Sequence, residues 1–194
     1  KLGAFQSSIC EGGIEKVSIE YRGKVAELSV APLTIAALKG LLSPILEDTV
    51  NYVNAPTIAQ ERGIGVEEST NRDAGDYISL ITMKVQTTAG TNEAKGALFS
   101  RRDPRIIEIN GYPLEVVPEG YMIVLSNIDK PGVVGNIGTI LSQHNINIAR
   151  MQFGRDFPGG KVLSVISIDS PASPELMEQI RTLPNVLSVK QIKL

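Results

Sequence analysis

The sequence contains no tryptophan, one cysteine and one histidine in 194 residues, and each of these scarcities removes a class of function. With a single thiol, Cys10, the chain cannot form an internal disulfide framework, and a lone thiol is typical of a cytoplasmic protein. The single imidazole, His144, falls at the end of an expected helix. One His and one Cys supply neither a convincing catalytic pair nor most of a zinc site, so we expect no metal.

A strong charge of one sign and long apolar runs are also missing. The net charge of −2 gives no reason to expect a nucleic-acid or membrane partner. No run approaches the ~20 apolar residues of a membrane span, and no signal-peptide pattern opens the chain. The hydrophobic content of 42% and charged content of 21% are those of a globular protein with one large or two small domains. Because the sequence starts at Lys1 rather than Met, we expect a fragment of a longer protein.

Residues 1–117 read as strands, then helices, then more strands, which predicts an α+β domain with helices on one side of a mixed or antiparallel sheet. Arg22-Gly23 is expected to be the turn between the first two strands, and Pro44 and Pro56 to interrupt the helices. The Asn110-Gly111 dipeptide is a hairpin signal. The expected strands are 14–21, 24–31, 65–68, 77–87, 93–100 and 105–109, and the expected helical segments are 32–46 and 49–62.

Residues 118–194 follow the order β-α-β-β-α-β, which predicts a ferredoxin-like domain after a linker rich in Pro and Gly over 112–120. Its second helix is well delimited, because Ser173 can cap it and Pro174 suits its first position. The exposed edges of so small a sheet favour pairing with a second copy, so we expect a homo-oligomer. The expected elements are strand 121–126, helix 133–143, strands 147–154 and 161–169, helix 174–183 and strand 187–194.

The stretch from Asn127 to Gly135 joins the first strand of this domain to its first helix and has the composition of a binding loop. Pro131 suits the first turn of a helix, and Gly132 lets a ligand approach the backbone. The unpaired N–H groups that follow, from Val133 onward, suit a carboxylate, and Asp129 suits an ammonium group. One pocket could therefore hold both ends of an amino acid, although a strand, turn and helix also form an ordinary connection.

Two further groups are candidates with plain alternatives. Asn147 begins the next strand, where its amide can bind a ligand or merely end the preceding helix. The arginines of Arg101-Arg102-Asp103-Pro104-Arg105 could clamp a phosphate or carboxylate, or simply form a solvated turn. We treat Arg101, Arg102 and Arg105 as a candidate anion site.

These motifs resemble two known families. Asn127-Ile128-Asp129-Lys130-Pro131-Gly132-Val133, followed by Asn147-Ile148-Ala149 on a βαββαβ frame, resembles the ACT domain, which binds amino acids and regulates enzymes. The first half is similar to the intervening, or allosteric substrate-binding, domain of long-type D-3-phosphoglycerate dehydrogenases, where it precedes an ACT domain. The residues that carry this second resemblance are Gly40-Leu41-Leu42, Glu47-Asp48, Tyr52-Val53-Asn54-Ala55-Pro56, Glu61-Arg62-Gly63 and Ile109-Asn110-Gly111.

The resemblance implies the regulatory part of an NAD-dependent enzyme of serine biosynthesis, whose catalytic domains lie elsewhere in the same polypeptide. L-serine would be its feedback effector, bound between two ACT domains. Some relatives carry His or Tyr in place of Asn127, and Arg105 lies where the family tends to be basic. The implied contacts are Asn127, Asp129, the backbone around Pro131, Gly132 and Val133, and Asn147 from the facing subunit.

The chain itself carries no Gly-x-Gly-x-x-Gly dinucleotide motif, so we expect neither NAD binding nor dehydrogenase activity from it alone. Three alternatives stay open. The first is the β chain of a bacterial L-serine dehydratase, although its N-terminal motif contains a His that Gln6-Ser7-Ser8-Ile9 lacks. The second is a purely structural oligomerisation module. The third is a separate enzyme that uses Cys10 or the arginine cluster.

Overall fold

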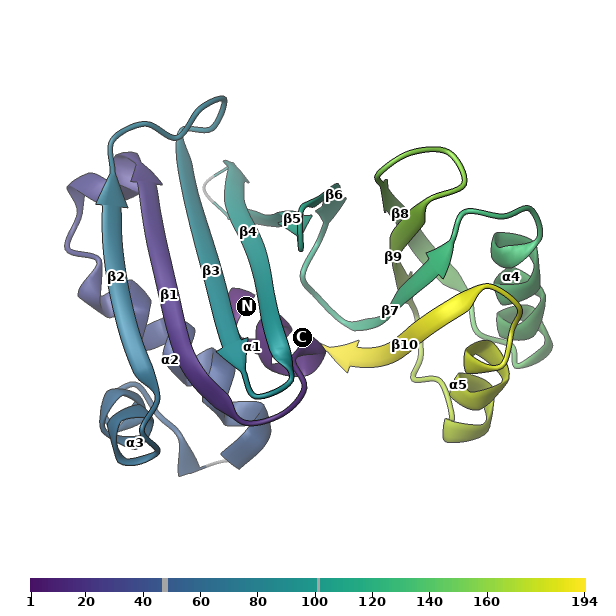
Figure 1. The fold of residues 1–194 in the computed structure, drawn as a ribbon, viewed down its shortest axis with the longest axis horizontal. Coiled ribbons are helices and arrows are strands. Elements are labelled where there is room, and N and C mark those ends of the chain that lie inside the picture. Colours follow the sequence, from purple (N-terminus) through teal and green to yellow (C-terminus); the bar gives the residue numbers. More distant parts are fainter. Residues whose placement is uncertain (47–48, 101) are drawn as a thin grey trace. The chain divides into compact units, whose positions relative to one another are not determined.

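The computed structural model describes residues 1–46, 49–100 and 102–194, which divide into two units, Lys1–Gly111 and Tyr112–Leu194 (Figure 1). The expected motif Glu47-Asp48 and the candidate Arg101 lie outside the described residues.

The first unit contains five strands of a six-stranded mixed sheet, in the order β2-β1-β3-β4-β5. Strand β1 pairs in parallel with β2 on one side and antiparallel with β3 on the other. The remaining pairs, β3–β4 and β4–β5, are antiparallel. The predicted mixed or antiparallel sheet is therefore confirmed. The bounds are β1 (Ile14–Gly23), β2 (Gly65–Asn71), β3 (Ser79–Thr87), β4 (Gly90–Ser100) and β5 (Asp103–Ile109).

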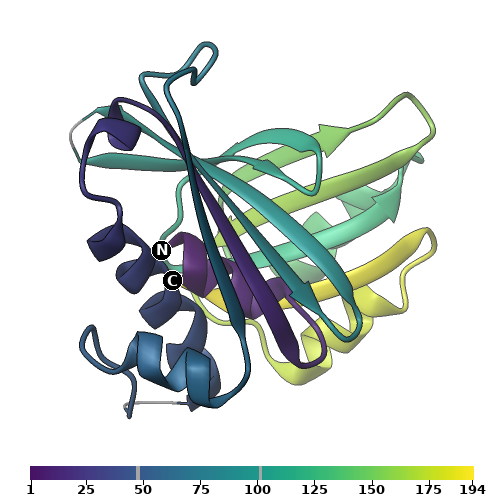
Figure 2. The ribbon, with the colours of Figure 1, turned by 60° about the vertical axis from the view of Figure 1, so that its left-hand side comes forward.

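Helices cover one face of this sheet, as predicted, and the described residues form three of them: α1 (Leu2–Ile9), α2 (Ala31–Leu46) and α3 (Ala55–Glu61) (Figures 1 and 2). Alternate residues of β1 point toward the helices because side chains along a strand alternate between its two faces. The resulting core joins strand residues to one apolar face of α2. Its fully buried members include Val17, Ile19, Tyr21, Leu38, Leu41, Leu42, Met83 and Val85.

One expected strand of this unit was wrong, and one helix was not predicted. The strand over 24–31 is instead a short 3₁₀ turn, η1 (Lys24–Glu27), which leads into α2. Gly23 turns the chain there with a φ of 75°, at a point where a Cβ would lie 2.3 Å from the carbonyl oxygen of Ile78. Helix α1 was not predicted at all, because no side chain caps it and no charge favours either end. It is held by tertiary contacts, since Phe5 and Gln6 are fully buried and the Gln6 amide donates to the Met83 carbonyl at 2.7 Å.

The prolines also act differently from the expectation. Pro44 lies inside α2, whose described bounds are Ala31–Leu46, and does not end it. Pro56 does not break a helix over 49–62 but occupies the first turn of α3, where its missing N–H has no intrahelical partner to lose. Asn110 and Gly111 have φ values of 51° and 83°, the left-handed conformation that the Asn-Gly hairpin signal predicts.

The second unit confirms the predicted ferredoxin-like domain. Four antiparallel strands run in the order β10-β7-β9-β8, and two helices cover one face (Figure 1). The core lies between helices and sheet and includes Ile123, Leu125, Ile137, Leu141, Ile166, Leu176 and Ile180. The bounds are β7 (Tyr121–Ile128), α4 (Val133–Gln143), β8 (Ile148–Arg155), β9 (Lys161–Ile168), α5 (Pro174–Arg181) and β10 (Val186–Lys193).

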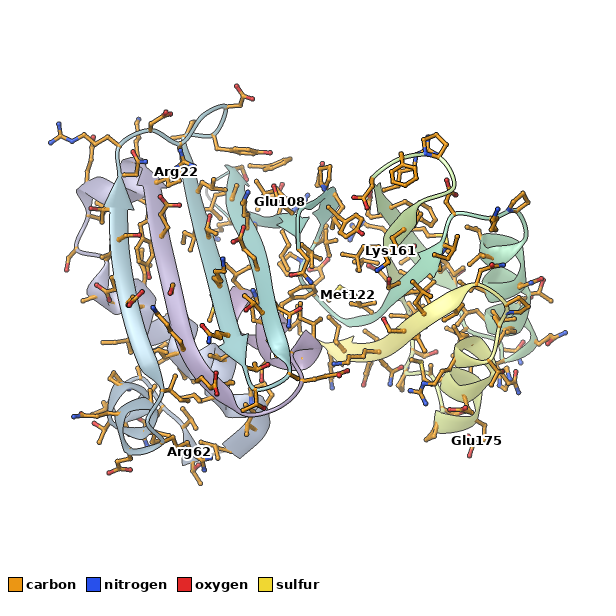
Figure 3. The ribbon with its side chains drawn as sticks, viewed as in Figure 1. Arg22, Arg62, Glu108, Met122, Lys161 and Glu175 are labelled. Atoms are coloured by element: carbon orange, nitrogen blue, oxygen red, sulfur yellow. The ribbon has the colours of Figure 1, made fainter. Side chains whose placement is uncertain are left out.

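Helix α5 begins as the sequence predicts. Ser173 is its N-cap and accepts a hydrogen bond from the Leu176 N–H at 3.2 Å, and Pro174 follows in the first turn. Glu175 lies at the start of the helix (Figure 3), where the free backbone N–H groups and the Ser173 hydroxyl lower the pKa of its carboxyl.

The expected linker over 112–120 contains a further strand, β6 (Tyr112–Val116), which packs against β8 within the second unit. A Cβ added at Gly154 of β8 would lie 2.8 Å from the Tyr112 Cβ, so the two strands touch at a point where only glycine fits. The Tyr112 hydroxyl donates to the Asp156 carboxylate at 3.2 Å. Desolvation is the largest cause that raises the pKa of Tyr112, and the hydrogen bond to the Asp156 carboxylate is the second. Residues 112–116 are thus part of the packed structure rather than a free connection.

Candidate binding site at the start of helix α4

The loop between β7 and α4 is held at its start by two backbone hydrogen bonds. The Ile128 N–H donates to the Asn185 carbonyl at 2.9 Å, and the Asp129 N–H donates to the Gly160 carbonyl at 2.8 Å. Gly132 is the N-cap residue, with a φ of 97° that a residue with a side chain rarely adopts. Pro131 therefore lies just before the cap rather than in the first turn, which corrects the expected position.

No side chain caps α4. Its first intrahelical bond runs from the Asn136 N–H to the Gly132 carbonyl at 2.8 Å. The N–H groups of Val133, Val134 and Gly135 precede that bond, so they have no partner within the helix. The positive end of the helix dipole coincides with these donors, and together they favour an anion.

A small cavity of about 50 Å³ opens beside this helix start. Its rim is polar, its walls are apolar, and Asn127 and Ser164 form a polar floor. Strand β9, which begins at Lys161 (Figure 3), contributes part of the lining. The lining residues are Leu125 and Asn127 of β7, Asp129 and Lys130 of the loop, Val133, Val134 and Ile137 of α4, Met151 and Phe153 of β8, and Val162, Ser164 and Ile166 of β9.

Asp129 stands at the rim with a carboxylate oriented by two contacts from the same chain. Its Oδ2 atom accepts from the Arg155 guanidinium at 3.2 Å and from the Gly159 N–H at 3.3 Å. The side chains of Asp129 and Arg155 are 35% and 57% exposed, so this ion pair contributes only about 0–1 kcal/mol to stability. Both contacts use Oδ2, so within the described part of the chain Oδ1 keeps its capacity to accept a hydrogen bond.

Arg155 and Ser164 are site residues that the sequence analysis missed. The β8–β9 register pairs Arg155 with Val162 and Phe153 with Ser164, which puts these side chains on the helix-covered face. Asn127 shares that face through the β7–β9 register. A serine on the same face of β9 as Val162, Ile166 and Ile168 was the only local signal for Ser164.

The other candidates lie apart from the loop. Asn147 precedes β8 and is exposed, with its amide donating to the Asp169 carboxylate at 2.7 Å, and it does not line the cavity of its own chain. Arg102 and Arg105 belong to the first unit. Arg105 forms an ion pair with Asp103 and lies 5.7 Å from the centroid of the Phe99 ring. The neighbouring carboxylate reduces the positive charge that the arginine cluster was expected to present.

The described residues offer little for cofactors. Within residues 1–46, 49–100 and 102–194, no three His, Cys, Asp or Glu side chains gather as a metal site requires. In the same ranges, no helix is both long enough and apolar enough to cross a membrane.

Comparison with known proteins identifies both units. Residues 1–110 match the family model of the D-3-phosphoglycerate dehydrogenase intervening domain, and residues 121–185 match that of the ACT domain. The D-3-phosphoglycerate dehydrogenases of Synechocystis sp. and Bacillus subtilis are 36% and 34% identical over all of this chain, which covers 35% and 37% of their lengths. That of Archaeoglobus fulgidus is 37% identical, again over the whole chain and 37% of the relative.

The chain thus spans a little over a third of the length of these relatives. The first match covers more than half of the 194 residues. This chain therefore belongs to the D-3-phosphoglycerate dehydrogenase intervening-domain family, and an ACT domain follows its intervening domain.

Proposed function

We propose that this chain is the regulatory region of an NAD-dependent D-3-phosphoglycerate dehydrogenase of serine biosynthesis, and that L-serine binds at the start of α4 as its feedback effector. The observation that carries the proposal is the meeting of three features at one point. These are an uncapped helix N-terminus, the Asp129 carboxylate and a small cavity. The similarity to D-3-phosphoglycerate dehydrogenases supports the parent activity that we propose.

The three features complement the three parts of a small amino acid. The carboxylate of the effector would accept hydrogen bonds from the first N–H groups of α4, as anions do at helix N-termini. Its ammonium would donate to the Oδ1 atom of Asp129, a charge-assisted bond. Its side chain would enter the cavity. Asn127, Pro131, Gly132 and Val133 shape the loop that brings these groups together.

A second copy of the domain would complete the site. Strand β8 is the edge of the sheet, and Phe153 on that strand is half exposed beside the cavity. Val134 of α4 is half exposed at the same opening. Apolar side chains exposed at an unpaired edge strand favour association. In this arrangement Asn147 of the facing copy would contact the effector.

Regulation would follow from the effector's preference for one placement of the paired domains. A ligand shifts such an equilibrium only by its differential affinity, typically about 1–3 kcal/mol of coupling. The catalytic domains of the same polypeptide are the partner that would respond. The matches do not favour the two alternatives, a serine dehydratase β chain and a purely structural module.

Isothermal titration calorimetry of the chain with L-serine tests the proposal. Loss of one charge-assisted hydrogen bond costs about 1.5–3 kcal/mol, so Asp129→Ala should weaken binding by about 10- to 150-fold. Glu178→Ala is a matched control, because Glu178 also forms an exposed pair with an arginine, Arg181, but on helix α5. We expect its affinity to equal that of the wild type. If the chain binds no serine, the proposed function is refuted. If Asp129→Ala binds serine with unchanged affinity, the assignment of the site is refuted.

A further inference from the structure

In the described part of the second unit, two polar side chains are buried, and both lie at the floor of the cavity. Asn127 is 5% exposed and Ser164 is 1% exposed. Their neighbours in the cavity wall, Leu125, Ile137 and Ile166, are apolar and themselves buried. A hydroxyl and an amide in such surroundings need hydrogen-bond partners, because protein interiors rarely leave polar groups unpaired.

The hydrogen bonds within the protein satisfy this pair only in part. The Asn127 amide nitrogen donates to the Ile128 carbonyl at 2.9 Å, which leaves the Asn127 Oδ1 atom as the acceptor on the cavity side. The Ser164 hydroxyl lies 3.5 Å from that oxygen. Normal O–H···O bonds span about 2.5–3.0 Å, so this contact is long. One good acceptor and one good donor therefore stand side by side at the floor.

The cavity volume limits what can reach them. One water molecule needs about 10–15 Å³ of such space, so about 50 Å³ admits only a few atoms. Drug-sized ligands occupy pockets of about 300–1,000 Å³. A methylene carrying a hydroxyl is within the limit, whereas a long or branched side chain exceeds it.

We propose that Ser164 determines the specificity of this site by hydrogen bonding, together with Asn127, to a hydroxyl on the effector's side chain. The effector hydroxyl donates to the Oδ1 atom of Asn127 and accepts from the Ser164 hydroxyl. This inference rests on the proposed function, because the amino and carboxylate groups must be held at the rim for the side chain to point inward. It gives a role to a residue outside the loop motif.

Alanine is the informative competitor, because it lacks only the hydroxyl. A site built to bond a hydroxyl rejects an analogue without it by a large factor, since its own buried polar groups are then left unpaired. If an ordered water satisfied the pair whatever the ligand, serine and alanine would bind with similar affinity. The ratio of the two affinities therefore reports the contact directly.

Titrations of the whole chain with L-serine and L-alanine, followed by calorimetry, test the inference. We expect the wild type to prefer serine by at least about tenfold. Ser164→Ala should reduce that preference to within about threefold, through weaker serine binding. Ser167→Ala, on the same strand but on its opposite face, should keep the wild-type preference. Ser164→Cys keeps a side chain of similar shape with a weak donor, and it should also lose the preference.

The outcomes separate the two proposals. If the wild type binds serine but prefers it no more than about threefold, or if Ser164→Ala and Ser164→Cys keep the full preference, the role of Ser164 is overturned and the proposed function stands. If the wild type binds no serine at all, both the proposed function and this inference are refuted. Circular dichroism of each variant establishes that it is folded, and Ser164→Cys supplies the result if Ser164→Ala does not fold.

Discussion

Replacing Gly154 with alanine tests how closely strand β6 packs on the ACT sheet. The added Cβ would lie 2.8 Å from the Tyr112 Cβ and 2.9 Å from the Pro113 carbonyl oxygen. Ordinary contacts between such atoms are about 3.5–4.0 Å. Neither atom is the free end of a side chain, so the overlap is relieved only if the backbone of β6 or β8 moves.

The expected cost follows from two opposing terms. Overpacking typically destabilises by about 1–3 kcal/mol. Removing a glycine from a strand returns about 0.5–1 kcal/mol, because alanine loses less backbone entropy on folding. Taking the middle of each range, the net destabilisation is about 1 kcal/mol, and local opening of these strands should become about 5- to 10-fold more frequent.

Amide hydrogen exchange read by mass spectrometry suits this prediction better than a melting temperature, because two units need not unfold as one cooperative transition. Peptides from β6 and β8 should exchange faster in Gly154→Ala. Gly160→Ala is the control, since a Cβ there meets only the ring of Phe157 at 3.1 Å, and that exposed ring can turn aside. Unchanged exchange in both strands of Gly154→Ala would refute the claim that β6 is packed against Gly154.

Two further changes test the energetics of each unit. Gly138→Ala, inside α4, adds a Cβ that meets no atom within 4 Å, so we expect urea unfolding to show a gain of about 0.5–1 kcal/mol. Tyr21→Phe removes a buried 2.8 Å hydrogen bond and leaves the Thr34 hydroxyl unpaired, at a cost of about 1–3 kcal/mol. Burial raises the pKa of Tyr21, so unfolded chains lose this proton first and stability falls as the pH rises above about 10. That decline, followed by urea unfolding between pH 8 and pH 11 (roughly the window around the ordinary tyrosine pKa), should be shallower in Tyr21→Phe.

Local signals predicted the second unit well. Helix α4 has the bounds expected from its apolar spacing, Val133–Gln143, and α5 begins at the Ser173 cap and Pro174. Short connections then leave few ways to arrange four strands and two helices. The family resemblance rested on the same local motifs, so it was available before any three-dimensional contact was known.

The first unit was harder because its contacts are long-range. Strand β1 pairs in parallel with β2, which begins at Gly65 and is separated from it by two helices. Helix α1 has no capping signal and depends on a close approach to α2 at Gly3, where a Cβ would lie 2.1 Å from the Ala37 carbonyl oxygen. Periodicity within one segment contains no record of such contacts, so the strand over 24–31 was wrong and α1 was missed.

The binding loop itself was read from adjacent residues, whereas the groups around it come from other strands. Asn127 and Asp129 are two residues apart, but Arg155 and Ser164 reach them only through the strand registers of the folded sheet. A shift of one residue in either register would turn both side chains to the opposite face. Sequence alone therefore indicated the rim of the cavity and, in Asn127, one of the two floor residues, but it did not indicate Ser164.

The arginine beside Asp129 strengthens the case for an ammonium site rather than blocking it. Arg155 and the Gly159 N–H both bind Oδ2, which fixes the carboxylate while Oδ1 remains an acceptor. An exposed pair of this kind contributes about 0–1 kcal/mol, whereas a hydrogen bond to a charged group contributes about 1.5–3 kcal/mol. The ammonium of an effector whose carboxylate is held by the start of α4 can thus bind next to Arg155, or displace it, with a net gain. Arg155 on this reasoning positions Asp129, and its loss should weaken effector binding less than the loss of Asp129 itself.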